Sequence, residues 1–151
     1  MIPERRAPLL IQLPPNLAKN ISRLTDYIAE YRALAQSAWE IAVEFRHDSW
    51  IDSETRHALD RAGAALCLHD MAGHGDTFTP NDVPFVYIRR HGSAARYSGN
   101  YGPEQIAADA DAVVNWIREG RRVFVYYNND IGGHAFFNAT DLRTTISSKL
   151  S

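Results

Sequence analysis

Short apolar runs that end in polar, chemically capable residues recur along this chain, and each is followed by a helix-like stretch. The clearest runs are LLIQLPP from Leu9, IAVEFRHDSW from Ile41, VYIRRHG from Val86 and VFVYYNND from Val123. Strands that alternate with helices indicate a parallel sheet in an α/β fold. Ligands in such folds bind at the carboxyl ends of the strands, so the polar ends of these runs are the predicted site.

The bulk properties limit the class of protein. The 151 residues are enough for a single domain, which we expect to span 1–151. The formal net charge of −2 argues against a protein whose main role is to neutralise nucleic-acid phosphates. No apolar stretch approaches the roughly 20 residues that span a bilayer, so no membrane partner is expected. The N-terminus has no signal-peptide pattern and the single cysteine, Cys67, cannot form an internal disulfide, so a cytoplasmic location is expected.

The pattern predicts about five strand-then-helix units. The expected strands are 9–13, 40–46, 64–68, 85–89 and 123–127. The expected helices begin after Asn16, at Asp52 or Ser53, at Gly102-Pro103-Glu104 and near His134. A closed (β/α)₈ barrel needs about 250 residues. The expected fold is therefore α/β, with TIM-barrel-like repeat units, about five parallel strands and an incomplete barrel.

Alternation along the strands sorts the polar residues onto faces. Glu44 and Arg46 share one face of their strand, and an ion pair between them would keep Glu44 ionised. Six polar residues are predicted to converge at one end of the sheet: Gln12, Glu44, Arg46, Arg89, His91 and Asn128.

Several of these residues suit proton transfer or anion binding. Glu44 is a candidate base or ligand for substrate hydroxyls, and Arg46 a candidate anion clamp, while a structural salt bridge is the alternative reading of this pair. His91 is the best single acid–base candidate, because histidine titrates near neutral pH, and His47 is a second. A structural hydrogen-bonding role is the alternative for both.

Aromatic and remaining polar residues complete the candidate site. Trp50, Tyr97 and Tyr101 are candidates for stacking on a ring or a sugar, or else cover the barrel mouth. Asp70, Asn128, Asn129 and Asp130 are further candidate ligand contacts. Nitrogen and oxygen donors for a metal exist in Glu44, His47, Asp70, His91 and Asp130, but no close-spaced metal motif is present and no metal is predicted. Phosphate-loop, dinucleotide and nucleophile-elbow motifs are absent from the sequence, so the cofactor stays unknown.

Taken together, the motifs LLIQLPP, WEIAVEFRHDSW, FVYIRRHG with YSGNYG, and VFVYYNND with AFFNA resemble the YecE-like family of uncharacterised proteins. This is domain-of-unknown-function family seventy-two, and the resemblance runs from about Leu9 to Leu142. It implies a TIM-barrel-like fold and places the candidate residues above, with Gly92, at family motif positions. It implies no settled activity. Family members usually begin with a further segment that carries the first strands, so the chain is expected to be truncated, or to cover its sheet edges with another chain.

These candidate site residues together predict an enzyme-like barrel that binds a small polar or anionic ligand at the carboxyl ends of the strands. Hydrolase, lyase and isomerase chemistry fit it equally. The alternatives are a non-catalytic binding module, with Arg89, Arg90, Arg96, Arg121 and Arg122 on nucleic acid, and an inactive truncated family member.

Overall fold

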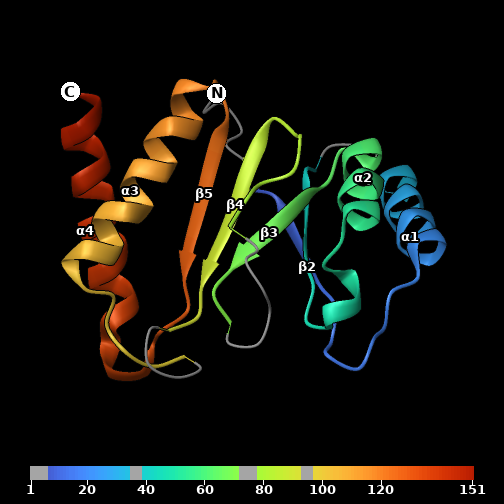
Figure 1. Cartoon of the computed structure of the whole chain (residues 1–151), viewed down its shortest axis with the longest axis horizontal. Coiled ribbons are helices and arrows are strands. Elements are labelled where there is room, and N and C mark those ends of the chain that lie inside the picture. Colours follow the sequence, from blue (N-terminus) through green and yellow to red (C-terminus); the bar gives the residue numbers. More distant parts are fainter. Residues whose placement is uncertain (1–6, 35–38, 72–77, 93–96) are drawn as a thin grey trace. The chain divides into compact units, whose positions relative to one another are not determined.

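The computed structural model describes residues 7–34, 39–71, 78–92 and 97–151 (Figure 1). The chain divides into two compact units. Unit 1 consists of Met1–Cys67 with His74–Val83, and unit 2 consists of Leu68–Gly73 with Pro84–Ser151. Each unit is described by itself, and the expectation of one domain over the whole chain stays a prediction.

Five strands follow one another in chain order, β1-β2-β3-β4-β5. They are β1 (Leu9–Gln12), β2 (Ile41–Glu44), β3 (Ala65–His69), β4 (Phe85–Arg90) and β5 (Arg122–Tyr127). In unit 1, β2 pairs in parallel with β1 and with the start of β3. In unit 2, β4 and β5 pair in parallel. The predicted parallel arrangement is therefore confirmed for these strands.

Helices alternate with the strands. They are α1 (Ile21–Leu34), α2 (Ser53–Ala62), α3 (Pro103–Arg118) and α4 (His134–Leu150), with short 3₁₀ turns at η1 (Asp48–Trp50) and η2 (Ile131–Gly133). Parallel strands in chain order, each followed by a helix or a connecting segment, are the repeat of a (β/α) barrel. The chain thus has the predicted α/β fold, with five strands of an incomplete TIM-like barrel.

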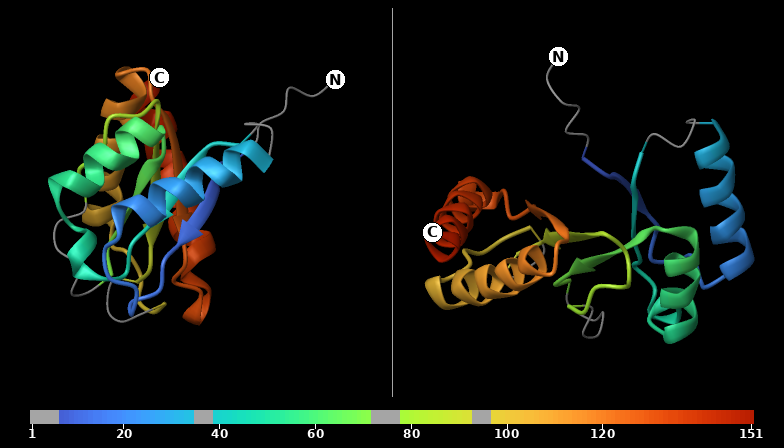
Figure 2. Two further views of the ribbon diagram at one scale, coloured as in Figure 1. Left: turned by 90° about the vertical axis from the view of Figure 1, so that its right-hand side faces the viewer. Right: turned by 90° about the horizontal axis from the view of Figure 1, so that it is seen from above.

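In unit 1, α1 and α2 lie side by side (Figures 1 and 2). Every residue of β2 is buried, as expected for an inner strand of a parallel sheet. The predicted limits of α2 are confirmed: the Asp52 side chain caps its first turn, and Gly63 ends it in the left-handed conformation at φ 61°.

The predicted start of the first helix is wrong. The sequence favoured Asn16 as its cap, whereas α1 begins at Ile21, and the Asn20 carboxamide oxygen accepts the Arg23 N–H at 2.9 Å. Contacts with a distant segment hold the intervening residues out of the helix. The Lys19 N–H donates to Ser49 Oγ at 2.8 Å, and the Leu17 carbonyl accepts the Trp50 indole N–H at 2.9 Å.

The hydrogen bonds of Asp52 imply that the stability of unit 1 depends on pH. Its Oδ1 accepts the Thr55 N–H at 2.8 Å and its Oδ2 pairs with the Lys19 ammonium. The hydrogen bond from Lys19, and then that from Thr55, lower the pKa of Asp52 from 3.8 to about 2. Because the folded pKa lies below the unfolded value, this stabilisation is present above the ordinary pKa and is lost as the pH falls through about 2.

Replacing Asp52 with asparagine should keep the cap, since Asn is as good an N-cap as Asp, and remove this acid-dependent contribution. Asp52→Ala should lose both, with a cap loss of about 1 kcal/mol at neutral pH. Urea unfolding at a series of pH values measures the difference. The assignment is wrong if wild type and Asp52→Asn lose stability in parallel as the medium is acidified.

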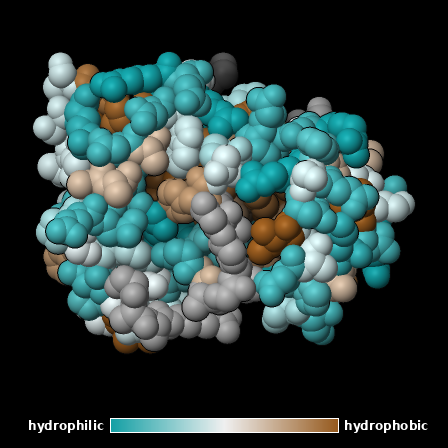
Figure 3. Space-filling model, viewed as in Figure 1, coloured by the Kyte–Doolittle hydropathy of each residue, from teal (hydrophilic) through white to brown (hydrophobic). Residues whose placement is uncertain are grey.

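In unit 2, α3 and α4 pack against each other and against β5 (Figures 1 and 2). Tyr101, Ile106, Ala110 and Leu142 form a buried apolar cluster there, with Val125, Tyr127 and Ile146 against it. The predicted start of α3 is confirmed, with Gly102 as its N-cap and Pro103 in the first turn. On the face of the molecule shown in Figure 3, hydrophilic residues predominate, and hydrophobic ones form small separate groups among the residues that are coloured.

Candidate functional site

Asp70 follows β3 directly and organises the carboxyl ends of the strands in unit 2. Its Oδ1 accepts the His91 backbone N–H at 2.8 Å, and its Oδ2 accepts the Tyr101 hydroxyl at 2.5 Å. The same hydroxyl accepts the Gly92 N–H at 2.6 Å. Asp70 and Tyr101 together therefore hold the segment that leaves β4 in one position.

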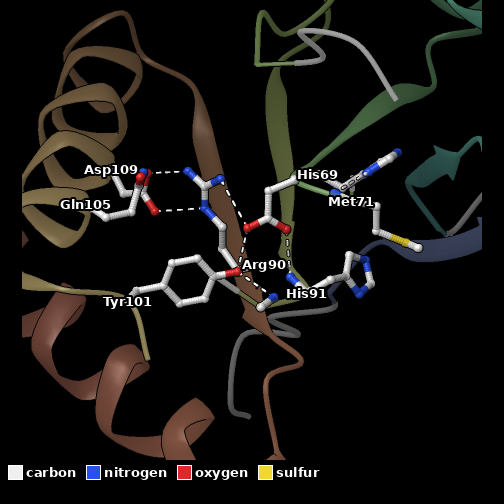
Figure 4. A network of polar contacts seen from close by, with 9 residues as sticks. His69, Met71, Arg90, His91, Tyr101, Gln105 and Asp109 are labelled. Atoms are coloured by element: carbon white, nitrogen blue, oxygen red, sulfur yellow. Dashed lines mark hydrogen bonds and ion pairs between the residues drawn. The ribbon is translucent and has the colours of Figure 1, made fainter. Parts of the chain in front are cut away.

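The Arg90 guanidinium connects Asp70 and Tyr101 to helix α3 (Figure 4). Its Nε donates to Asp109 Oδ2 at 2.8 Å, and its Nη2 pairs with the other oxygen of the same carboxylate. A third nitrogen lies 3.6 Å from Asp70 Oδ2. Gln105, one turn before Asp109, donates to that carboxylate at 3.0 Å. Two carboxylates thus flank one buried guanidinium, and we call Asp70, Arg90, Tyr101 and Asp109 the Asp70–Arg90 network.

Tyr101 acts as a neutral donor in this network. Burial raises the pKa of its hydroxyl far above the ordinary value, and the Asp70 carboxylate that accepts its hydrogen bond raises it further. Burial also raises the pKa of Tyr127, whose ring meets that of Tyr101 edge-on at 5.5 Å between centroids. Both phenols are protonated throughout the physiological range.

The His91 ring contacts two other aromatic side chains. Its centroid is 6.2 Å from that of His69 and 5.7 Å from that of Tyr97, both edge-on. Tyr97 has a left-handed backbone at φ 63°, an unusual conformation for a residue with a side chain, and its N–H donates to the His91 carbonyl at 2.5 Å. Strained backbone of this kind clusters at functional sites.

A second polar group lies in unit 1. Glu44 and Arg46 form the predicted ion pair, with exposed side-chain fractions of 0% and 4%. Arg46 also donates to Gln12 Oε1 at 3.3 Å, and the Cys67 thiol lies 3.7 Å from Glu44 Oε2. The predicted proximity of Gln12, Glu44 and Arg46 is thus confirmed within this unit. Their burial fits a structural ion pair at least as well as a ligand site.

The remaining candidates differ in accessibility. Trp50 is 3% exposed and stacks on Phe45 at 4.6 Å, so these contacts fit the covering role better than ligand stacking. His47 caps η1 by accepting the Ser49 N–H at Nδ1. Asn129 is fully buried, and its amide donates to the Gly99 carbonyl and to Asn138 Oδ1.

Five predicted ligand contacts in unit 2 reach the surface at least partly: Asp70, Arg89, Tyr97 and Asn128 are half-buried, and Asp130 is exposed. The Asn128 N–H donates to the Arg90 carbonyl at 2.7 Å, which continues the β4–β5 pairing, so that Asn128 lies at the same end of the sheet as His91. Arg89, His91 and Asn128 thus lie at the same end of the β4–β5 ladder, and the convergence of all six predicted residues stays a prediction.

The arginine set considered for nucleic-acid binding does not form a patch among the described residues. Arg90 is 5% exposed and is held by Asp109, so it is directed at α3 rather than at solvent. Arg122 begins β5 opposite Phe85, whereas Arg89 pairs with Tyr126 at the other end of the same ladder. Four residues of strand separate the two ends by about 13 Å. Arg96 lies outside the described residues.

Sequence reasoning missed two buried polar residues around the Asp70–Arg90 network. Asp109 occupies the apolar stripe of α3 between Ile106 and Ala110, and a charged residue in such a stripe signals a buried partner. Asn138, in α4, donates to Asn100 Oδ1 and to the Tyr101 carbonyl and so fixes the loop that carries Tyr101. No comparable signal in the sequence marked Asn138 beyond its place in the AFFNA motif.

Neither a cluster of metal ligands nor a membrane-spanning helix is present among the residues that the structure describes. No three His, Cys, Asp or Glu side chains among them are grouped to hold a metal ion. None of the helices described is both long enough and apolar enough to cross a membrane.

Solved structures confirm the class of fold. A DUF72 family protein from Thermotoga maritima matches 91% of this chain at 25% identity with a TM-score of 0.77, and the match covers 56% of that protein. A DUF72 family protein from Enterococcus faecalis, in two crystal structures, matches 93% of this chain at 21% and 23% identity. The TM-scores are 0.78 and 0.75, over 58% and 61% of that chain.

The family model described as "Protein of unknown function DUF72" matches residues 2–150. The chain therefore belongs to the DUF72 family, and the family resemblance of its motifs is confirmed. It spans a little more than half the length of the solved relatives that it matches. No curated protein matched the chain.

Proposed function

We propose that this protein binds a small anionic molecule at the carboxyl ends of the strands of unit 2 and carries out acid–base chemistry there. The observation that supports this most is the Asp70 carboxylate, which binds the His91 N–H and the Tyr101 hydroxyl at the point where β4 ends. Polar groups held rigidly at strand ends are the usual framework of a site in parallel α/β folds.

In this proposal Arg89 binds the anion. Its guanidinium is always protonated, carries five donors in a planar fork and is half-buried at the end of β4. Partial burial strengthens a charge-assisted hydrogen bond, since the surrounding dielectric is lower than that of water. Asn128, half-buried at the matching end of β5, supplies an amide for hydroxyl or carbonyl groups of the ligand.

His91 is the proposed proton carrier. Its backbone N–H is bound by Asp70, the residue is 1% exposed, and its ring contacts those of His69 and Tyr97. Proton transfer by a positioned histidine is common to hydrolases, lyases and isomerases, and the proposal leaves the choice among them open. We assign no role at this site to Glu44, which pairs with Arg46 in unit 1.

Replacing Arg89 with alanine tests the anion site. A charge-assisted hydrogen bond contributes about 1.5–3 kcal/mol, so affinity for inorganic phosphate should fall by about tenfold or more. Isothermal titration calorimetry on the full chain measures this, with the thermal unfolding midpoint as a check on folding. Arg122→Ala, at the other end of the β4–β5 ladder, is the matched control and should bind as wild type does. Equal loss in both variants, or unchanged affinity in Arg89→Ala, removes Arg89 from the site.

A further inference from the structure

The two faces of the β4–β5 ladder in unit 2 have different surroundings. Arg90 on β4 binds Asp109 of α3. Its partner in register, Tyr127, packs against the apolar cluster that α3 and α4 help to form. Because side chains alternate along a strand, the residues next to these, Arg89 and Tyr126, lie on the face away from the helices. They are also partners in register.

This second face is a ladder of aromatic rings that ends in a charge. Phe85 and Phe124 meet edge-on at 6.3 Å between centroids, and Tyr87 and Tyr126 stack at 5.0 Å with 27° between their planes. Phe85 and Tyr87 are buried, at 1% and 5% exposed, whereas Tyr126 is 36% exposed. The ladder therefore presents one supported aromatic ring to solvent, directly beside Arg89.

Tyr126 is better placed for stacking than two of the aromatic residues that the sequence suggested. Trp50 and Tyr101 are 3% and 4% exposed and have their polar atoms engaged in hydrogen bonds. The Tyr126 ring is backed on one side by Tyr87, which fixes its orientation and lowers the entropy lost when a ligand stacks on it.

We propose that Tyr126 and Arg89 form a subsite for a ring compound that carries a phosphate or carboxylate group. The ring stacks on Tyr126 while the anionic group binds the adjacent guanidinium, since the two side chains are register partners on one face. This rests on the proposed function, to which it adds the ligand class. Sugar phosphates and nucleotides share this chemistry, and the experiment separates them.

The experiment uses four probes on the full chain, measured by calorimetry: glucose 6-phosphate, adenosine monophosphate, glucose and inorganic phosphate. At least one of the two ring-bearing phosphates should bind several-fold more tightly than inorganic phosphate, and glucose should bind more weakly than glucose 6-phosphate. Which of the two phosphates binds more tightly identifies the sugar or the base as the stacked ring.

The variants then separate the two contacts. Tyr126→Ala should weaken the ring-bearing phosphate about fivefold and leave inorganic phosphate unchanged, and Tyr126→Phe should bind as wild type does. Tyr27→Ala, a 53% exposed tyrosine on α1, is the matched control and should have no effect. Arg89→Gln should weaken both ligands.

The outcomes that overturn the two proposals differ. If Arg89→Gln weakens binding of the ring-bearing phosphate and of inorganic phosphate while Tyr126→Ala changes neither, the stacking subsite is wrong and the anion site stands. If Tyr126→Ala lowers the affinity for the ring-bearing phosphate and for inorganic phosphate equally, the subsite is also wrong, because an equal loss indicates a general change in the strand. If none of the charged probes binds the wild-type chain, both proposals fail.

Discussion

Asp109→Ala is expected to lower the free energy of unfolding by about 3–5 kcal/mol, because it takes from a buried guanidinium the carboxylate that binds it most closely. Arg90 is 5% exposed, and two of its nitrogens bind the Asp109 carboxylate. In the variant, Asp70 at 3.6 Å remains as the weaker counter-ion. Urea unfolding followed by far-ultraviolet circular dichroism measures the change.

Asp111→Ala is the matched control on the same helix. The Asp111 carboxylate pairs with Lys149 at 2.8 Å, but its side chain is 63% exposed, and exposed pairs contribute about 0–1 kcal/mol. The two variants remove the same chemical group from positions two residues apart. Equal, small effects in both would show that the Asp70–Arg90 network does not stabilise unit 2.

Glu44→Ala is expected to have an effect of similar size in unit 1, about 3–5 kcal/mol. The substitution leaves the Arg46 guanidinium, 4% exposed, without the carboxylate that lies against it, and the Gln12 carboxamide at 3.3 Å is a neutral substitute. The same unfolding experiment measures it.

The double variant Glu44→Leu with Arg46→Met separates the cost of an orphaned charge from the value of the pair. Replacing a whole buried ion pair with apolar residues of similar size is often neutral or stabilising. The double variant should therefore recover most of the stability that Glu44→Ala loses. A double variant as unstable as Glu44→Ala would mean that the pair itself, rather than the unpaired charge, determines stability here.

The elements that the sequence predicts well are those with local signals. Helix α2 has Asp52 as its cap and Gly63 as its end, and α3 has Pro103 in its first turn, and each signal lies within a few residues of the boundary that it marks. The start of α1 was missed because Asn16 and Asn20 are equally good caps on local grounds. The contacts that decide between them come from Ser49 and Trp50, about 30 residues further along the chain.

The candidate site, too, was predictable only where the sequence signal is local. Alternation predicted Arg89 and His91 for one face of the strand, and the hydrogen bond from the Asn128 N–H to the Arg90 carbonyl puts Asn128 at the same end of the ladder. The partner of Arg90 is 19 residues away on a helix, and no local pattern connects the two. Tyr126 was not among the predicted site residues, and its exposure beside a buried Tyr87 depends on packing that a sequence pattern does not describe.

The most direct test of the proposed anion site is a titration of the full chain with inorganic phosphate, followed by assigned amide ¹H–¹⁵N spectra. We expect the largest shifts at Arg89, His91 and Gly92, where β4 ends and the Asp70 carboxylate and the Tyr101 hydroxyl hold the backbone. Shifts concentrated at Arg121 and Arg122, or spread evenly over the surface arginines, would contradict it.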